Sequence, residues 1–333
     1  MSEAGDAGSA GRARGGAAGA PPFAAGSVSV GLHLLEDADA AGHAARLVEQ
    51  AQVAEAAGFS GVTFPEHHGG FPGYMGLPGL AANWVLAATA RLWAAPAPYL
   101  LNFRNPVLAA EELAWTNARF PGRFGAALAS GYARSDFELL GVEFEGKAAR
   151  FEELLGLLLA TVEGRGQGSG DPAFRYWAEH PAPIVSAANT KPGARRAARF
   201  GMSLFFPGGE SRARVREMIA AYREEGGRGT VTKVRPMWLG EAPPGAIEKR
   251  EAMYRAAAVG GSRQAAGFAE PFLCGGVDQV IEELTRDIEE IGLDGLNLRF
   301  HLEGGDHRRV CEQIAEFGAE VLPRIGPRLS AGP

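Results

Sequence analysis

The sequence lacks the features that mark secreted, membrane-spanning and nucleic-acid-binding proteins. Its 333 residues include only two cysteines, Cys274 and Cys311, which lie far apart without metal-site spacing, so a reducing compartment is favoured. No apolar run approaches the ~20 residues that a membrane span needs. The formal net charge of −6 argues against a basic nucleic-acid-binding surface. We therefore expect a cytoplasmic protein that binds neither nucleic acid nor membrane.

The two ends of the chain have little to bury. Residues 1–26 are mostly Gly, Ala and Ser, and such a segment cannot offset the entropy lost on ordering. It has neither the continuous apolar stretch of a secretory signal nor a twin arginine. We expect a disordered tail over residues 1–26, one folded domain over 27–326 and a short C-terminal tail over 327–333.

Between these tails, eight short β-type runs alternate with longer helical patterns. The runs are SVSVGLHLL, GVTFPE, LWAAPAPYLL, FGAALAS, APIVSAAN, MSLFF, KVRPMWLG and GLNLRFH. Among the helix candidates, residues 43–58 repeat apolar residues at helical spacing, the segment 106–120 opens with Pro106, and 277–292 ends at Gly292. Eight strands alternating with helices indicate a parallel sheet closed into a single (β/α)8 TIM barrel. An open doubly wound sheet is the structural alternative.

Two stretches are longer than a bare connection requires. Residues 131–182 contain an acidic and apolar helical pattern followed by RGQGSGDP, and residues 241–277 are partly helical. Long insertions in barrels are usually lids or binding loops. We therefore expect lid-like insertions at these places and no separate domain.

The second strand-like run ends in Glu66, His67 and His68, and His33 and His301 follow the first and eighth runs. In a parallel barrel the active site forms at the carboxyl ends of the strands. Imidazole titrates near neutrality, so one of these rings is suited to move a proton to or from a ligand. A histidine at a strand end is also a polar residue tolerated near solvent, and the pattern alone leaves both interpretations open.

Four stretches together resemble the bacterial luciferase-like flavin monooxygenases. They are GVTFPEHH, the segment from NPVLAAEELAWTNARF to GYARSDFELLGV, RFEELL, and PIVSAANTKPGARRAARFG, and the resemblance runs from about residue 28 to 325. It implies that His67 transfers protons beside a flavin, with Glu66 and His68 lining the pocket. The family's cis peptide at the end of the third strand, against which the flavin ring packs, corresponds here to Ala97–Pro98. Proline makes the cis isomer far cheaper than the ~3 kcal/mol of an ordinary bond.

In the fourth strand the resemblance implies flavin contacts from Ala129 and Ser130. These residues replace the reactive cysteine and the arginine of luciferase, so a thiol and one phosphate-binding cation are missing. Arg150 matches a second arginine that the family places on the phosphate.

The stretch SAANTKPG matches the family's phosphate-binding helix start. Thr190 matches a serine, Asn189 replaces an acidic residue, and Gly193 falls where a hydroxyl is expected. Lys191 is a candidate to restore part of the lost charge. Unsatisfied amides and the helix dipole favour an anion at such a position, and Thr190 also suits a plain N-cap.

The function that the resemblance implies is that of a two-component monooxygenase. The sequence shows no G-x-G-x-x-G for a nicotinamide cofactor, so FMN would arrive as FMNH2 from a separate flavin reductase. Reaction with O2 would give a flavin peroxide or hydroperoxide that oxygenates a small-molecule or carrier-bound substrate. FGAALASGYARSDF resembles luciferase-like proteins of polyketide and peptide assembly lines, which favours a natural product, as in antibiotic biosynthesis. The family also implies a homodimer packed through barrel helices.

Three alternatives remain on the sequence alone. The same barrel serves hydride-transferring enzymes that use the deazaflavin coenzyme F420. A metal-dependent hydrolase built on His33, His67 and His301 is a second, although strand one lacks the closely paired histidines of such sites, and we expect no metal. A flavin-binding barrel that has lost its chemistry is the third, and retention of Glu66-His67-His68 argues against it.

Overall fold

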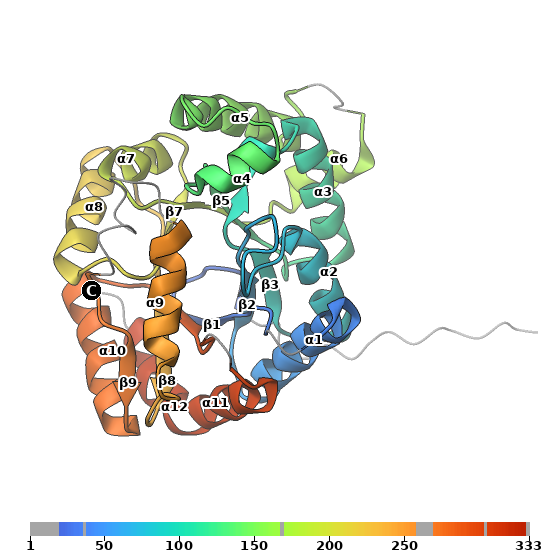
Figure 1. The fold of residues 1–333 in the computed structure, drawn as a ribbon. Coiled ribbons are helices and arrows are strands. Elements are labelled where there is room, and N and C mark those ends of the chain that lie inside the picture. Colours follow the sequence, from blue (N-terminus) through green and yellow to red (C-terminus); the bar gives the residue numbers. More distant parts are fainter. Residues whose placement is uncertain (1–19, 36–37, 167–169, 258–268, 303–304, 331–333) are drawn as a thin grey trace, which may run out of the picture.

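A computed structural model describes residues 20–35, 38–166, 170–257, 269–302 and 305–330 (Figure 1). The strands are β1 (Ser27–Gly31), β2 (Gly61–Phe64), β3 (Trp93–Pro96), β4 (Tyr99–Leu100), β5 (Ala126–Ala129), β6 (Ile184–Ala187), β7 (Ser203–Phe206), β8 (Val231–Leu239), β9 (Leu273–Gly275) and β10 (Gly295–Arg299). The helices are α1 (Ala40–Ala56), α2 (Pro78–Ala88), α3 (Pro106–Arg119), α4 (Arg134–Leu139), α5 (Lys147–Val162), α6 (Pro172–Glu179), α7 (Lys191–Arg199), α8 (Arg212–Glu224), α9 (Ala246–Ala257), α10 (Val277–Ile291), α11 (His307–Glu320) and α12 (Leu322–Ser330), with a short 3-10 turn η1 (Leu101–Phe103).

The strands form a nearly closed parallel barrel with helices around it, which confirms the predicted fold class (Figure 1). The strand order is β3-β2-β1-β10-β8-β7-β6-β5-β4, and β9 extends the sheet beside β8. All eight predicted runs contain a strand. Helices connect the successive strands of the barrel, because parallel strands need a crossover to return to the same end.

The third barrel strand is split into β3 and β4. The Ala97–Pro98 peptide bond between them is cis, as the sequence predicts. β3 pairs with β2, and β4 pairs with β5. A bridge between Ala94 and Phe124 also joins β3 to the segment before β5, so that the two short strands together close the ring.

Side chains inside the barrel divide into two unlike halves. Around β3, β5 and β6 the interior cluster includes the small residues Ala95, Ala97, Ala127 and the partly buried Ala187, together with the larger Trp93 and Val185. On β1, β2 and β10 the interior is polar, because Asn297 Nδ2 donates to Ser29 Oγ at 2.9 Å and to Thr63 Oγ1 at 3.0 Å. Alternation along each strand sends the neighbouring large residues outward to the helices.

Phe23 closes the amino-terminal end of the barrel. Its ring lies 5.0 Å from that of Trp93 and 5.8 Å from that of Phe205, and its carbonyl accepts a hydrogen bond from Thr230 Oγ1 at 2.9 Å. Residues 1–19 of the predicted tail lie outside the described residues, whereas Phe23 is 3% exposed. The boundary at residue 26 was therefore placed too late, since one large aromatic at the end of a Gly/Ala segment has enough apolar surface to be held.

At the other end, α12 continues through most of the predicted tail over 327–333. The helix reaches Ser330, and Leu329 on it is 2% exposed. The predicted tail is therefore wrong for residues 327–330, because Leu329 continues the apolar face set by Val321 and Ile325. Residues 331–333 lie outside the described residues.

The two predicted insertions contain α4, α5 and α6, and α9 and β9, respectively. Figure 1 shows α4 and α9 in front of the strands when the barrel is viewed end-on. The part of the second insertion over residues 258–268 lies outside the described residues.

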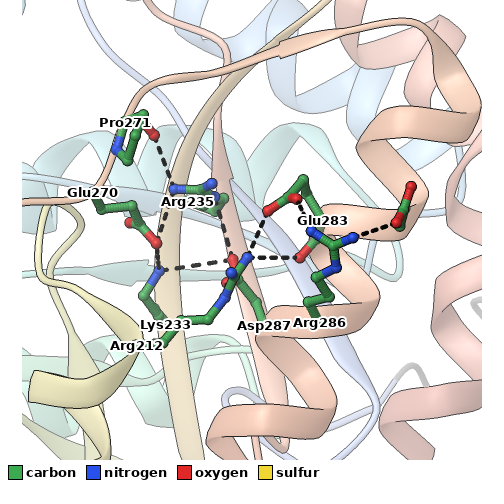
Figure 2. A network of polar contacts seen from close by, with 9 residues as sticks. Arg212, Lys233, Arg235, Glu270, Pro271, Glu283, Arg286 and Asp287 are labelled. Carbon is green, nitrogen blue, oxygen red and sulfur yellow. Dashed lines mark hydrogen bonds and ion pairs between the residues drawn. The ribbon is translucent and has the colours of Figure 1, made fainter.

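A buried ionic network fastens the end of the second insertion to the outer face of β8 (Figure 2). Lys233 Nζ lies 2.6 Å from Glu270 Oε1, and Arg235 pairs with both Glu270 and Asp287 of α10. Both cations are almost fully buried, so their charges need these carboxylates. Within the described part of the chain, no helix is both long and apolar enough to cross a membrane.

Candidate active site

His67 is held at both ring nitrogens at the carboxyl end of β2. Its Nδ1 lies 2.7 Å from Asp136 Oδ2, and its Nε2 lies 3.1 Å from the Tyr132 hydroxyl. The Asp136 carboxylate only accepts, so Nδ1 carries the proton that is donated to it. In the neutral ring Nε2 then accepts from Tyr132, and Nε2 is the atom that can take up or release a proton.

Aromatic rings surround the His67 imidazole and keep water from it. Phe71 stacks on it with ring centroids 4.3 Å apart, and Tyr74 meets it edge-on at 4.7 Å. The Tyr74 hydroxyl forms a hydrogen bond with the hydroxyl of Tyr254 on α9, which ties this insertion to the loop after β2. Burial raises the pKa of both Tyr74 and Tyr132, so both phenols are neutral near pH 7.

Asp136 was missed by the sequence analysis. It lies on the short helix α4, is 2% exposed, and its second oxygen accepts from the backbone N–H of His68 at 3.3 Å. Asp136 and His67 are 69 positions apart, and a single acidic residue in a stretch read as an insertion carries no local signal of this contact. The only hint was the insertion's position after a barrel strand.

His68 and Glu66 form a separate polar cluster. Glu66 Oε1 accepts from His68 Nε2 at 2.9 Å and from Arg104 Nη1 at 2.6 Å, while its Oε2 accepts from the backbone N–H of Leu100 at 2.9 Å. Leu100 is the second residue after Pro98, so Glu66 fixes the end of β2 against the chain that follows the cis bond. These contacts join Glu66 to His68, to Arg104 and to the chain that follows the cis bond.

His33 and His301 stack on each other, with ring centroids 4.7 Å apart, on the other side of Tyr74. Burial lowers the pKa of His33 well below its usual value and, with a contribution from Arg250, lowers that of His301 to about 4. Both rings are therefore neutral near pH 7. Within the described residues, the one group of side chains close enough to share a metal ion is Glu49, His307 and Cys311 on the helical surface, so the geometry does not favour the hydrolase alternative.

The predicted phosphate contacts gather only in part at the ends of β5 and β6. Asn102 Nδ2 donates to the carbonyl of Ser130 at 2.8 Å and to that of Lys147 at 3.0 Å, which brings Ser130 next to the start of α5. Ala129 precedes it on the inward-facing side of β5, and Arg150 lies in the first turn of α5. Arg150 donates from Nη2 to the carbonyl of Glu143, and its buried Nε has no hydrogen-bond partner among the described residues.

The start of α7 offers fewer hydrogen-bond donors to a phosphate than the sequence predicts. Thr190 is the N-cap, and its hydroxyl accepts the N–H of Gly193 at 3.1 Å, while Pro192 has no N–H to give. Asn189 is half-buried just before the cap. Lys191 is not brought to this site, because its ammonium pairs with Glu217 of α8 at 3.2 Å.

Arg196 supplies a cation that the sequence analysis missed. One of its terminal nitrogens lies 3.8 Å from the point that a Cβ at Gly193 would occupy, and its guanidinium covers the ring of Phe151, the neighbour of Arg150. Among the described residues its Nε, which is buried, has no hydrogen-bond partner. The signal available in the sequence was its i+3 position from Gly193.

Sequence similarity to known proteins identifies the family of this chain. The family profile of luciferase-like monooxygenases matches residues 26–237. The chain belongs to the luciferase-like monooxygenase family. The alkanal monooxygenase alpha chain of Photorhabdus luminescens is 28% identical over 149 residues, which are 45% of this chain and 41% of that protein. The match thus spans less than half the length of this curated relative.

Solved structures share the fold of this family member over nearly its whole length. Monooxygenase RslO1 from Streptomyces bottropensis has a TM-score of 0.72 at 19% identity and covers 89% of this chain and 99% of its own. The oxygenating constituent of 3,6-diketocamphane monooxygenase from Pseudomonas putida, in complex with FMN, has a TM-score of 0.71 at 14% identity, covering 90% and 98%. An F420-dependent secondary alcohol dehydrogenase has a TM-score of 0.71 at 15% identity, also covering 90% and 98%. At these identities the likeness shows the fold alone.

Proposed function

We propose that this chain is an FMN-dependent monooxygenase that receives FMNH2 from a separate flavin reductase and uses O2 to oxygenate an organic substrate. The observation that carries the proposal is the position of His67. Its Nε2 is directed by the Asp136 contact on Nδ1, and it lies at the end of β2, next to the strand that contains Ala97–Pro98. A proton-handling group at this place is what flavin oxygenation requires from the protein.

The interior of the barrel fits a flavin ring. A planar tricyclic ring needs a flat wall without long side chains, and Ala95, Ala97, Ala127 and Ala129 make such a wall on β3 and β5. When bound, reduced FMN supplies the two electrons with which one oxygen atom of O2 enters the substrate and the other leaves as water.

Two arginines fit the phosphate of FMN. Arg150 and Arg196 each have a buried Nε without a hydrogen-bond partner among the described residues, and the Thr190 hydroxyl lies beside Gly193. Arg196 replaces the positive charge that is missing at Ser130. We place Arg150, Arg196 and Thr190 on the phosphate, with Ser130 and Asn189 at its edge.

The other residues position groups and exclude water. His67 Nε2 exchanges a proton with the bound ligands, Tyr132 is its neutral partner, and Phe71 and Tyr74 cover the ring. Closing a site in this way strengthens every electrostatic interaction inside it. Glu66 and His68 hold the strand ends in register.

We also propose a homodimer, because α2 and α3, which are neighbours in the fold (Figure 1), both carry large exposed apolar side chains. Leu80 on α2 and Leu108 and Trp115 on α3 are 44%, 65% and 53% exposed. Leu108 and Trp115 are seven positions apart and therefore share one face of α3. A patch of this kind on a helix pair marks a protein interface.

The function is tested by supplying chemically reduced FMN and O2 to the purified chain together with an extract of the source cells. Mass spectrometry should show a compound that gains one oxygen atom only when the chain, FMNH2 and O2 are all present. A gain of oxygen from FMNH2 without the chain would contradict the assignment. The class of the product also tests the natural-product prediction.

The cofactor is tested separately by anaerobic titration with FMN, riboflavin and coenzyme F420. We expect FMN to bind more tightly than riboflavin, because only FMN carries the phosphate. Tight binding of F420 alone, and its reduction by an alcohol without O2 consumption, would favour the deazaflavin alternative. Flavin binding without any turnover would favour the non-catalytic barrel.

A further inference from the structure

Arg299 is a cation at the barrel mouth without a counter-charge among the described residues. It ends β10 on the same face as Asn297, whose side chain points into the barrel. Gly31 on β1 leaves room for it, since a Cβ there would lie 2.8 Å from Arg299 Cγ. Arg299 Nε is buried, and no described residue gives it a hydrogen-bond partner.

Three other cations of the described chain, Arg104, Lys233 and Arg235, are paired with carboxylates. Arg104 bonds to Glu66 at 2.6 Å, and Lys233 and Arg235 share Glu270 and Asp287 on the outside of the barrel (Figure 2). A charge that is partly removed from water is stabilised by a partner of opposite sign. Because no described residue supplies one to Arg299, its guanidinium is available to a ligand at the barrel mouth.

The groups around Arg299 are neutral. His33, His301, Tyr74 and Tyr132 all interact with its charge, and burial lowers the pKa values of the two histidines and raises those of the two tyrosines. None of the four carries a negative charge near pH 7. Asp136, which approaches Tyr132, is already committed to His67.

The position of Arg299 separates it from the proposed flavin contacts. In the strand order, β10 is four strands from β5 in both directions, when β3 and β4 are counted as one strand. Arg299 thus faces the alanine wall from the opposite side of the mouth. It also lies beyond residue 237, where the family match ends.

We propose that Arg299 binds a carboxylate of the organic substrate, so that the substrate class of this enzyme is an organic acid. The planar guanidinium fork matches a carboxylate in a bidentate pair, and the rings of Phe71, Tyr74 and Tyr254 supply an apolar lining for the rest of the molecule. The assignment to the substrate rests on the proposed function, since it places the flavin on the alanine wall.

The test measures binding of matched acid and amide pairs by isothermal titration calorimetry. The probes are trans-cinnamate with trans-cinnamamide and hexanoate with hexanamide, at low ionic strength, on the flavin-free and the FMN-loaded protein. The wild-type chain should bind at least one acid about tenfold or more tightly than its amide. Arg299→Met should abolish this preference, Arg299→Lys should retain part of it, and Arg308→Met, which changes an exposed arginine of α11, should leave it unchanged.

Two controls keep the outcomes distinct. Thermal unfolding without ligand should show Arg299→Met at least as stable as the wild type, because no ion pair with a described residue is lost; a clear loss would mean that Arg299 is a structural ion-pair member and overturn the proposal. The absence of an acid preference in the wild type, whether both probes bind or neither does, also overturns it. If Arg299→Met instead weakens FMN and riboflavin equally, the guanidinium belongs to the flavin ring. If FMN does not bind the wild type, the proposed function fails. Calorimetry on the flavin-free chain then still decides whether Arg299 binds a carboxylate.

Discussion

The two adjacent histidines at the end of β2 have unlike surroundings. The ring of His67 lies among Asp136, Tyr132 and Phe71, whereas the ring of His68 is bonded to Glu66 and lies edge-on to Phe103. Side chains of consecutive residues in an extended segment point to opposite sides, so only one ring of such a pair can face the ligand. The alternation of side chains along the backbone therefore explains why the two rings have different neighbours.

His67→Ala should uncouple the reaction while leaving the fold intact. Loss of a general acid–base group typically costs ~100-fold to ~10,000-fold, so substrate oxygenated per flavin oxidised should fall by at least the lower figure, with hydrogen peroxide released in its place. Product and peroxide are measured together in single-turnover reactions. His68→Ala is the matched comparison and should remain largely coupled. The reverse result would exchange the roles of the two residues.

His301 should make the protein sensitive to acid. Its neutral ring stacks on His33 and lies near the charges of Arg250 and Arg299, and its pKa is lowered from about 6.5 to about 4. Between these values the unfolded chain binds more protons than the folded one, so stability is present above pH 6.5 and is lost as the pH falls toward 4. The contribution is on the order of 1 to 3 kcal/mol.

Urea unfolding followed from pH 7 to pH 4 measures this effect. His301→Asn should flatten the fall in unfolding free energy, and His180→Asn, at an exposed position, should leave the wild-type slope. Equal slopes for all three proteins would contradict a neutral His301 in the fold.

At the scale of elements, we propose that Arg150 on α5 and Arg196 on α7 hold the phosphate. Arg196 would replace the positive charge that is missing at Ser130. Arg199 of α7 pairs with Glu152 of α5 at 2.9 Å, so the two helices are fixed relative to each other and carry Arg196 and Arg150 with them. Among the described residues neither Nε has a hydrogen-bond partner, so a bound phosphate would satisfy donors that are already in place.

Arg196→Met should weaken FMN binding by ~10-fold to ~100-fold, as expected for one hydrogen bond to a charged group, and should leave riboflavin unchanged. Fluorescence titration of both flavins against wild type, Arg150→Met and Arg196→Met measures the difference. Arg195→Met is the control on the same helix, since its guanidinium is turned toward Glu224 on α8. An equal loss for FMN and riboflavin in the Arg196 variant would remove that residue from the phosphate site.

Strands and barrel helices were predictable because each carries its own periodic pattern. The cis bond at Ala97–Pro98 followed from its place in the family pattern together with the chemistry of proline. Asp136 and Arg196 could not be found in this way, because their importance comes from contacts across the fold and not from their neighbours in sequence. The burial of Phe23 could not be predicted for a related reason, since a single aromatic residue forms no periodic pattern.

At the scale of the whole molecule, the exposed face of α2 and α3 should decide the oligomeric state. Trp115→Asp combined with Leu108→Asp places two charges on the face that we propose to be buried between subunits, and should convert a dimer into a monomer. Light scattering after size-exclusion chromatography gives the mass. Trp115→Phe should stay dimeric, and a monomeric wild type at micromolar concentration would contradict the interface.

The aromatic seal formed by Phe23, Trp93 and Phe205 has a consequence for the order of events in turnover. The three rings pack together at the amino-terminal end of the barrel, so we expect flavin and substrate to enter from the opposite end, where His67 lies. Flavin and organic substrate would then share one entrance, and the ligand that binds deeper would bind first and leave last. We therefore expect compulsory-order kinetics in which flavin binds before the organic substrate.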